Sequence, residues 1–97
     1  MRLEWDEKKN RANHAKHGVS FETAALVFDD PLHLSRRDRE EGGEERWRTI
    51  GCVAEIVVLV VAHTYREEGG DEVIRIISAR KASRSERRIY EEESRES

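Results

Sequence analysis

The sequence predicts an α+β domain: a short strand, two helices, an antiparallel meander of about four strands and a C-terminal helix. Three observations predict it. Two helix-start signals stand near the N-terminus, strand-like segments fill the middle of the chain, and a third helix-start signal precedes the C-terminus. A length of 97 residues fits one domain, so we expect residues 1–97 to form a single unit with its helices on one side of a curved sheet.

The N-terminal third predicts a strand and two helices. Residues 2–5 alternate as a short strand does, and Asp6 is a good N-cap for a helix over residues 7–16. Gly18 stands where a helix commonly stops, and Ser20 is a second N-cap. The apolar residues of the short second helix recur at helical spacing; they are Phe21, Ala24, Ala25 and Phe28.

The central part predicts the meander. Its strand-like segments cover residues 32–35, 46–53, 56–65 and 73–79. The third segment is rich in β-branched and apolar residues and is bounded by turn signals, which is typical of a central strand. Residues 36–45 are polar and contain two consecutive glycines, so we expect a mobile loop there. Tight connections are expected at residues 54–55 and 67–71.

The last element is marked by a capping box. Ser83 and Glu86 have the spacing at which a serine hydroxyl and a glutamate carboxylate satisfy each other's backbone N–H groups. This pattern predicts a helix from Arg84 to about Glu93.

Composition excludes several classes of protein. The longest apolar run, residues 56–62, is shorter than the roughly 20 residues of a membrane span. The first residues lack the apolar stretch of a secretory signal, and the single cysteine, Cys52, excludes an intramolecular disulfide. We therefore expect a soluble, cytoplasmic domain without a membrane partner.

The net charge of −3 conceals a segregation of charge. Fourteen of the eighteen cations are arginine, the side chain best suited to bidentate contact with phosphate or carboxylate. Residues 73–90 hold six cations and a single acid, Glu86. This pattern fits an anion-binding surface, and it equally fits an exterior of exposed ion pairs.

The residue types available restrict the chemistry. The four histidines, at positions 14, 17, 33 and 63, form no metal-binding motif, and the glycines form no nucleotide-binding loop. We therefore expect neither a metal nor a cofactor. Arginine, histidine, glutamate and tyrosine remain, and they suit RNA cleavage in which the ribose 2′-OH of the substrate is the nucleophile.

Strand alternation separates two of the arginines. Strict alternation places Arg80 on one face of the strand at residues 73–81 and Arg75 on the other. His63 and Arg66 lie on the preceding strand, and the sequence does not fix the register between the two.

Five segments stand out together: Lys16–Glu22, Phe28–Pro31, Glu45-Arg46 with Gly51 five residues later, Arg75–Arg80 and Glu86–Tyr90. In this order and spacing they resemble the BrnT family, the toxins of type II BrnT/BrnA toxin–antitoxin modules. The resemblance runs from about Trp5 to Tyr90. It implies a RelE-like fold and an endoribonuclease that arrests translation. It also implies a BrnA-type ribbon-helix-helix antitoxin, a heterotetramer of two toxins on an antitoxin dimer, and operator DNA contacted only through the antitoxin. The net charge departs from the basic character of many RelE-like toxins.

We expect Arg75 and Arg80 to bind the scissile phosphate. The candidates for the base are His17 and Glu45, and those for the acid are His63 and Tyr90. The residues expected to contact the substrate are Lys16, Arg46, Arg66 and Arg87.

Each assignment has a structural alternative. The arginines would pair with Glu45 or Glu86, His17 would cap its helix, and His63 and Tyr90 would be packed inside the protein. A rival hypothesis is a catalytically inactive module that only holds the antitoxin and co-represses its operon.

Overall fold

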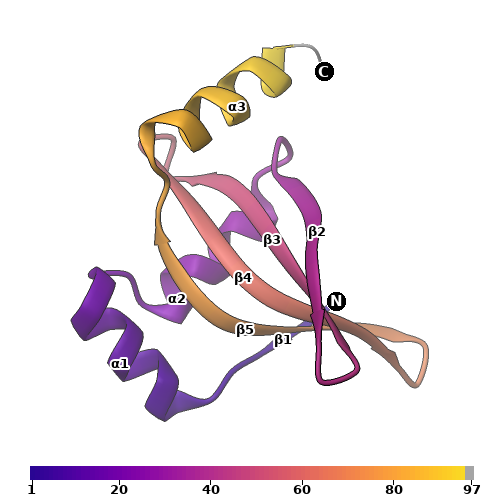
Figure 1. The fold of residues 1–97 in the computed structure, drawn as a ribbon. Coiled ribbons are helices and arrows are strands. Elements are labelled where there is room, and N and C mark those ends of the chain that lie inside the picture. The colour runs from indigo at the N-terminus through magenta and orange to yellow at the C-terminus, as the bar shows by residue number, and fades with distance from the viewer. Residues whose placement is uncertain (96–97) are drawn as a thin grey trace.

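The computed structural model describes residues 1–95, which form a five-stranded sheet, three α-helices and one 3-10 helix (Figure 1). The elements are β1 (Arg2–Glu4), α1 (Glu7–His17), α2 (Phe21–Ala25), η1 (Leu26–Asp29), β2 (Leu34–Glu41), β3 (Glu44–Val53), β4 (Val57–Glu68), β5 (Asp71–Lys81) and α3 (Arg84–Arg95). The strand order is β1-β5-β4-β3-β2, with β1 parallel to β5 and the other pairs antiparallel. None of the helices in this described part is long and apolar enough to span a membrane.

The sequence-based prediction of a mobile loop over residues 36–45 is wrong. Most of this segment belongs to β2, which pairs with β3 around a turn at Gly42 and Gly43, both with positive φ. A strand of charged residues gives no apolar alternation, so its sequence does not indicate a strand. It forms because β3 supplies backbone partners and opposite charges, such as Glu45 for Arg37 at 3.7 Å.

The core lies between one face of the sheet and the N-terminal helices. Its buried apolar side chains come from α2, η1, β4, β5 and the segment between α1 and α2; they are Val19, Phe21, Ala24, Val27, Leu59, Val61, Ile76 and Ala79. The apolar run predicted as a central strand therefore is β4, between β3 and β5.

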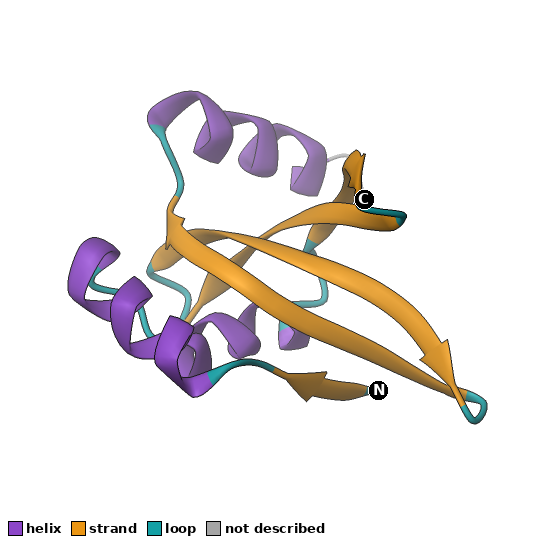
Figure 2. Cartoon of the chain, turned by 60° about the horizontal axis from the view of Figure 1, so that its bottom comes forward, coloured by secondary structure: helices purple, strands orange, loops and turns teal. Residues whose placement is uncertain are grey.

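The expectation that all helices lie on one side of the sheet is wrong for α3. Figure 2 shows α3 above the sheet and α1 and α2 below it. Glu86 and Ile89 of α3 line a hollow with Ile50 and Val60, whose side chains project from the face opposite to the core. One contact that holds α3 there is the pair between Arg80 on that face and Glu86, six residues later in the first turn of the helix.

The three predicted helix starts are confirmed at the level of their hydrogen bonds. Asp6 accepts from the backbone N–H groups of Lys8 and Lys9, and Ser20 accepts from that of Thr23. In α3 the capping box is complete, since Ser83 N–H donates to Glu86 at 2.8 Å and Glu86 N–H donates to the Ser83 hydroxyl at 3.2 Å.

Two buried asparagines attach α1 to the rest of the protein. Asn10 accepts a hydrogen bond from Phe21 N–H at 2.8 Å, which fixes the start of α2. Asn13 donates to the Ala79 carbonyl group at 2.9 Å and accepts from the Ala79 N–H group at 3.1 Å. The strand β1 pairs with β5 only from Val73 to Arg75. Farther along the same edge of β5, the side-chain amide of Asn13 takes the place of a neighbouring strand and pairs with the backbone groups of Ala79.

Gly51 allows η1 to approach β3 closely. A Cβ atom at this position would lie 2.6 Å from Val27 Cγ1 and 3.0 Å from the Val27 carbonyl oxygen. A larger residue would therefore push η1 away from the sheet.

Candidate functional site

Arginine side chains gather on the face of the sheet opposite to α1 and α2. Residues directly opposite each other in neighbouring strands share a face, so the register identifies this set. The arginines on the face are Arg2, Arg36, Arg39, Arg46, Arg48, Arg66, Arg75 and Arg80. Arg2 pairs with Glu68 at 3.3 Å. We call this surface the arginine face.

The structure corrects the expectation that Arg75 and Arg80 lie on opposite faces. Arg75 is opposite Thr64 and Arg80 is opposite Val60, two β4 residues on the same face. The pairing shifts by one residue between Ala62 and His63, so β5 contains an extra residue between its two arginines. This bulge reverses the alternation and brings both guanidinium groups to the arginine face.

Most cations of the arginine face are already paired within the protein. Arg80 forms a bidentate pair with Glu86, with N–O distances of 2.7 and 2.9 Å. This hydrogen bonding lowers the pKa of Glu86 to about 2, so the pair is fully charged at neutral pH. The other pairs are Arg36–Glu93, Arg39–Glu41, Arg48–Asp38, Arg66–Glu4 and Arg66–Glu68.

Three neighbouring residues in one cross-strand row differ from this pattern. Arg46, Thr64 and Arg75 lie opposite one another on β3, β4 and β5. Arg75 makes no salt bridge within residues 1–95, although its charge helps to lower the pKa of Asp6. The one salt bridge of Arg46 in this part of the chain is a long contact of 3.9 Å with Glu44. The buried Arg46 Nε and Thr64 Oγ1 atoms have no hydrogen-bond partner. Two cations and two unsatisfied polar atoms in one row suit an oxyanion with several acceptor oxygens.

Two of the residues expected at the site, Arg46 and Arg75, lie in this row. Two more, Arg66 and Arg80, lie outside the row on the arginine face. The other expected residues lie elsewhere. Lys16 and His17 are exposed at the end of α1, which packs on the opposite side of the sheet. Glu45 alternates with Arg46 and pairs with Arg37, and Arg87 is exposed on α3.

His63 projects into the protein on the core side of the sheet and is 3% exposed. Its Nδ1 lies 3.1 Å from the Thr64 carbonyl oxygen and must donate to it, so Nε2 accepts from the Thr49 hydroxyl at 2.7 Å. Burial lowers the pKa of His63, which keeps the ring neutral.

Tyr90 is also enclosed. It is 8% exposed, and its hydroxyl group donates to an Asp30 carboxylate oxygen at 2.6 Å. Burial and this hydrogen bond raise the pKa of Tyr90, which makes the hydroxyl a weaker acid than an exposed tyrosine.

Sequence reasoning missed Thr64, Arg48 and Arg36. Thr64 carries no motif, and its place between two arginines depends on the register of three strands. Arg36 was missed because residues 36–45 were expected to form a loop, and Arg48 was missed because it carries no motif within the predicted strand at residues 46–53. The only signal for them was the excess of arginine over lysine.

The described residues contain no group of three or more histidine, cysteine or acidic side chains arranged to hold a metal ion. The chemistry that the arginine face itself offers is the binding of anions through guanidinium groups.

The fold and this face define a small α+β protein that presents a row of cations from a curved sheet to an anionic ligand. The sequence model of the family described as "Ribonuclease toxin, BrnT, of type II toxin-antitoxin system" matches residues 5–86. The fold resembles the crystal structure of the Brucella abortus ribonuclease toxin BrnT, with a TM-score of 0.60 and 30% sequence identity, over 87% of this chain and 99% of that one. No curated protein gave a significant sequence match.

The chain therefore belongs to the BrnT family of ribonuclease toxins of type II toxin–antitoxin systems. This membership confirms the family resemblance and the α+β class that the sequence predicted.

Proposed function

We propose that this BrnT-family chain is a cytoplasmic, metal-independent endoribonuclease that arrests translation and holds the scissile phosphate on the row formed by Arg46, Thr64 and Arg75. The observation that carries the proposal is the state of Arg75, which makes no salt bridge within residues 1–95 and lies beside the unsatisfied Thr64 hydroxyl. Glu4, opposite Arg75 on β1, pairs with Arg66 instead. Such a row provides donors where the phosphate develops negative charge in the transition state.

The reaction is attack of the ribose 2′-OH on the adjacent phosphorus, and no protein nucleophile is needed. The 2′-oxygen loses its proton as it bonds to phosphorus, and the 5′-oxygen gains a proton as its bond to phosphorus breaks. The products are a 2′,3′-cyclic phosphate and a 5′-hydroxyl end. Arg46 and Arg75 neutralise the charge of the phosphorane from either side of Thr64. Arg80 and Arg66 are each paired with a carboxylate of the protein, which the substrate must displace before it can bind there. We therefore assign them to the phosphates that flank the cleaved one.

RNA cleavage in EDTA tests the proposal. The wild-type chain should cleave RNA at an unchanged rate in EDTA, and Arg75→Ala should lower the rate about ten- to a hundredfold, the cost of one charge-stabilising donor. Arg75→Lys should fall between the two, because it keeps the charge and loses the bidentate fork.

Arg11→Ala is the matched control, since Arg11 is exposed on α1 and pairs with no residue in the described part of the chain. Loss of activity in EDTA would contradict metal independence. Equal rates for Arg75→Ala and Arg11→Ala, with both variants folded by circular dichroism, would contradict the assignment of the row.

The partner we propose is a BrnA-type ribbon-helix-helix antitoxin, which would contact operator DNA and bind two toxins in a heterotetramer. Family membership supports an antitoxin partner. Acidic antitoxin side chains would compete with RNA for the arginine face. Native mass spectrometry of the co-expressed pair should give two copies of each chain, and added antitoxin should stop cleavage.

The second candidate is an inactive module that only holds the antitoxin. The internal pairing of Arg48, Arg66 and Arg80, together with the net charge of −3, favours it. Expression in cells separates the two functions. Growth arrest that Arg75→Ala relieves supports the nuclease, whereas harmless expression of soluble wild-type protein supports the module.

A further inference from the structure

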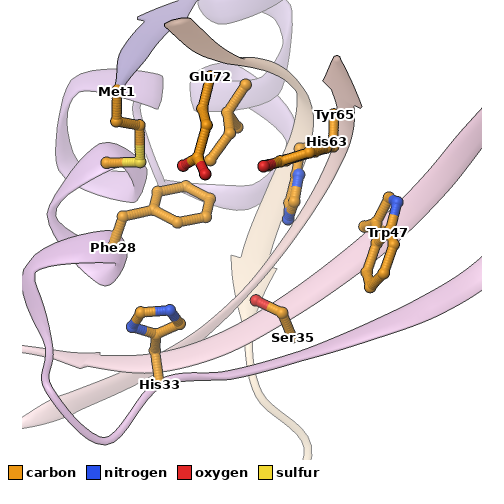
Figure 3. A pocket seen from close by; sticks show the side chains of 9 residues that line it. Met1, Phe28, His33, Ser35, Trp47, His63, Tyr65 and Glu72 are labelled. Atoms are coloured by element: carbon orange, nitrogen blue, oxygen red, sulfur yellow. The ribbon is translucent and has the colours of Figure 1, made fainter. Parts of the chain in front are cut away.

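A second hollow lies on the other face of the sheet and plays no part in the proposed cleavage. Its volume is about 340 Å³, at the lower end of the roughly 300–1,000 Å³ range of ligand sites. The residues that matter for its chemistry are Phe28, His33, Ser35, Trp47, Tyr65 and Glu72 (Figure 3). We call it the aromatic hollow.

Aromatic side chains form much of its wall. The Trp47 and Tyr65 rings have centroids 6.5 Å apart and are tilted by 55°, so they form two faces of a wedge. Phe28 contributes a third ring from η1. A cation within about 6 Å of such ring centroids is attracted by the negative faces of the rings.

The polar groups of the hollow are mainly acceptors. Glu72 is exposed and makes no salt bridge within residues 1–95. The Tyr65 hydroxyl group points toward the Glu72 carboxylate in Figure 3, and a hydrogen bond to it raises the pKa of Tyr65. His33 lies with Nδ1 2.7 Å from the Asp30 carbonyl oxygen, so neutral His33 presents an unprotonated Nε2.

The surrounding charge is negative. Glu67 also makes no salt bridge in the described chain, and its charge contributes to the raised pKa of Tyr65. Two cations lie near the hollow, and both are paired: the Met1 ammonium group with Asp71 at 3.2 Å, and Arg37, opposite Trp47 on β2, with Glu45 at 3.7 Å. The aromatic hollow therefore repels phosphate, and an apolar side chain would desolvate Glu72 without giving it a partner.

We propose that the aromatic hollow binds an arginine side chain of a partner polypeptide. A guanidinium group is planar enough to lie against Trp47 and Tyr65, and its N–H fork matches the two oxygens of Glu72. A lysine ammonium group fits less well, because it cannot stack and donate a bidentate pair at once. The family to which the chain belongs acts with an antitoxin, and this antitoxin is a polypeptide that could supply the arginine. The proposal does not depend on the nuclease activity of the arginine face.

The test uses two tripeptides on the full-length protein. Acetyl-Gly-Arg-Gly-amide and acetyl-Gly-citrulline-Gly-amide have nearly the same shape, but only the first carries a charge. The NMR signal of the Trp47 indole N–H, assigned with Trp47→Phe, reports binding. We expect the arginine peptide to shift this signal and to bind about tenfold or more tightly than the citrulline peptide.

Glu72→Gln should weaken the arginine peptide about fivefold or more, whereas Glu55→Gln should not. Glu55 is an exposed acid in the turn between β3 and β4, at the other end of the sheet, so the second variant changes net charge equally. The peptide comparison uses the wild-type chain and stands even if Glu72→Gln does not fold.

Equal affinity for the two peptides would overturn the proposal, as would equal binding by folded Glu72→Gln and Glu55→Gln. A shift of the Trp47 signal by 5′-GMP but not by the arginine peptide would also overturn it and would identify the hollow as a nucleobase site. None of these readouts measures RNA cleavage, so failure here is distinct from failure of the proposed nuclease.

Discussion

The Tyr90 hydroxyl group and the Asp30 carboxylate form a 2.6 Å hydrogen bond across 60 residues of sequence. The same carboxylate oxygen accepts from Cys52 N–H at 2.7 Å, and the other accepts from Leu32 N–H at 2.9 Å. Burial alone would raise the pKa of Asp30, but these hydrogen bonds outweigh it and lower the pKa. One carboxylate thus joins α3, β3 and the segment after η1.

Tyr90→Phe should lower the free energy of unfolding by about 1–2 kcal/mol, because Asp30 loses a donor in a partly buried place. Urea unfolding measures the change. RNA cleavage should stay within about threefold of wild type, since Tyr90 does not belong to the arginine row. Tyr65→Phe is the control, because Tyr65 is exposed and should change stability by less than about 0.5 kcal/mol. Equal losses for the two variants would show that the Asp30 contact contributes no stability.

The Arg80–Glu86 pair should make the free energy of unfolding depend on pH in the acid range. Hydrogen bonding to Arg80 lowers the pKa of Glu86 from 4.5 to about 2, so the folded state keeps this carboxylate charged where the unfolded chain protonates it. The stabilisation is complete above pH 4.5 and is lost as pH falls toward 2. Urea unfolding between pH 3 and pH 7 should show a steeper acid loss for wild type than for Glu86→Gln.

Glu92→Gln is the control for this experiment, because Glu92 is exposed on the same helix. It should keep the wild-type pH profile. A Glu86→Gln profile parallel to that of wild type would contradict the role of the pair.

His63 sets a second pH dependence in a different range. Burial lowers the pKa of His63 below its ordinary value of 6.5. Just below pH 6.5, therefore, the unfolded chain binds a proton at His63 more readily than the folded protein does. The free energy of unfolding should therefore fall as pH drops below 6.5 and be constant for this group above it. The midpoint of the His63 ring titration in NMR should lie below pH 6.5 in the folded protein.

His63→Gln should lose the decline that begins below pH 6.5, and exposed His14→Gln should retain it. A His63 ring that titrates near 6.5 in the folded protein would contradict the buried, neutral assignment.

The turn between β3 and β4 offers a stabilising substitution. Ala54 and Glu55 have φ values of 55° and 59°, a region that costs residues with a Cβ atom about 1–2 kcal/mol. Ala54→Gly should raise the free energy of unfolding by about 1 kcal/mol, measured by urea unfolding. Ala12→Gly, in the exposed interior of α1, should lower it by about 1 kcal/mol. The same sign for both would contradict strain at Ala54.

Local signals predicted the elements that depend on neighbouring residues. The caps at Asp6, Ser20 and Ser83 involve partners two or three positions away, so their spacing is visible in the sequence. The apolar run of β4 is equally local, because a long β-branched segment has few alternatives to a buried strand.

Contacts between distant residues decided the rest. The charged strand β2 exists because β3 pairs with it, and no local pattern encodes that partner. Asn10 and Asn13 look like ordinary polar residues of an exposed helix, yet each satisfies a backbone group of another element.

The sequence by itself determined the order of the elements, the helix starts and the family. Only the tertiary structure decided which arginines act together. A bulge in β5 brings Arg75 and Arg80 to one face, Glu86 then occupies Arg80, and Arg75 remains unpaired beside Thr64. The physical reason is that one residue added to a strand reverses every side chain beyond it, and strand register is fixed by pairing rather than by local sequence.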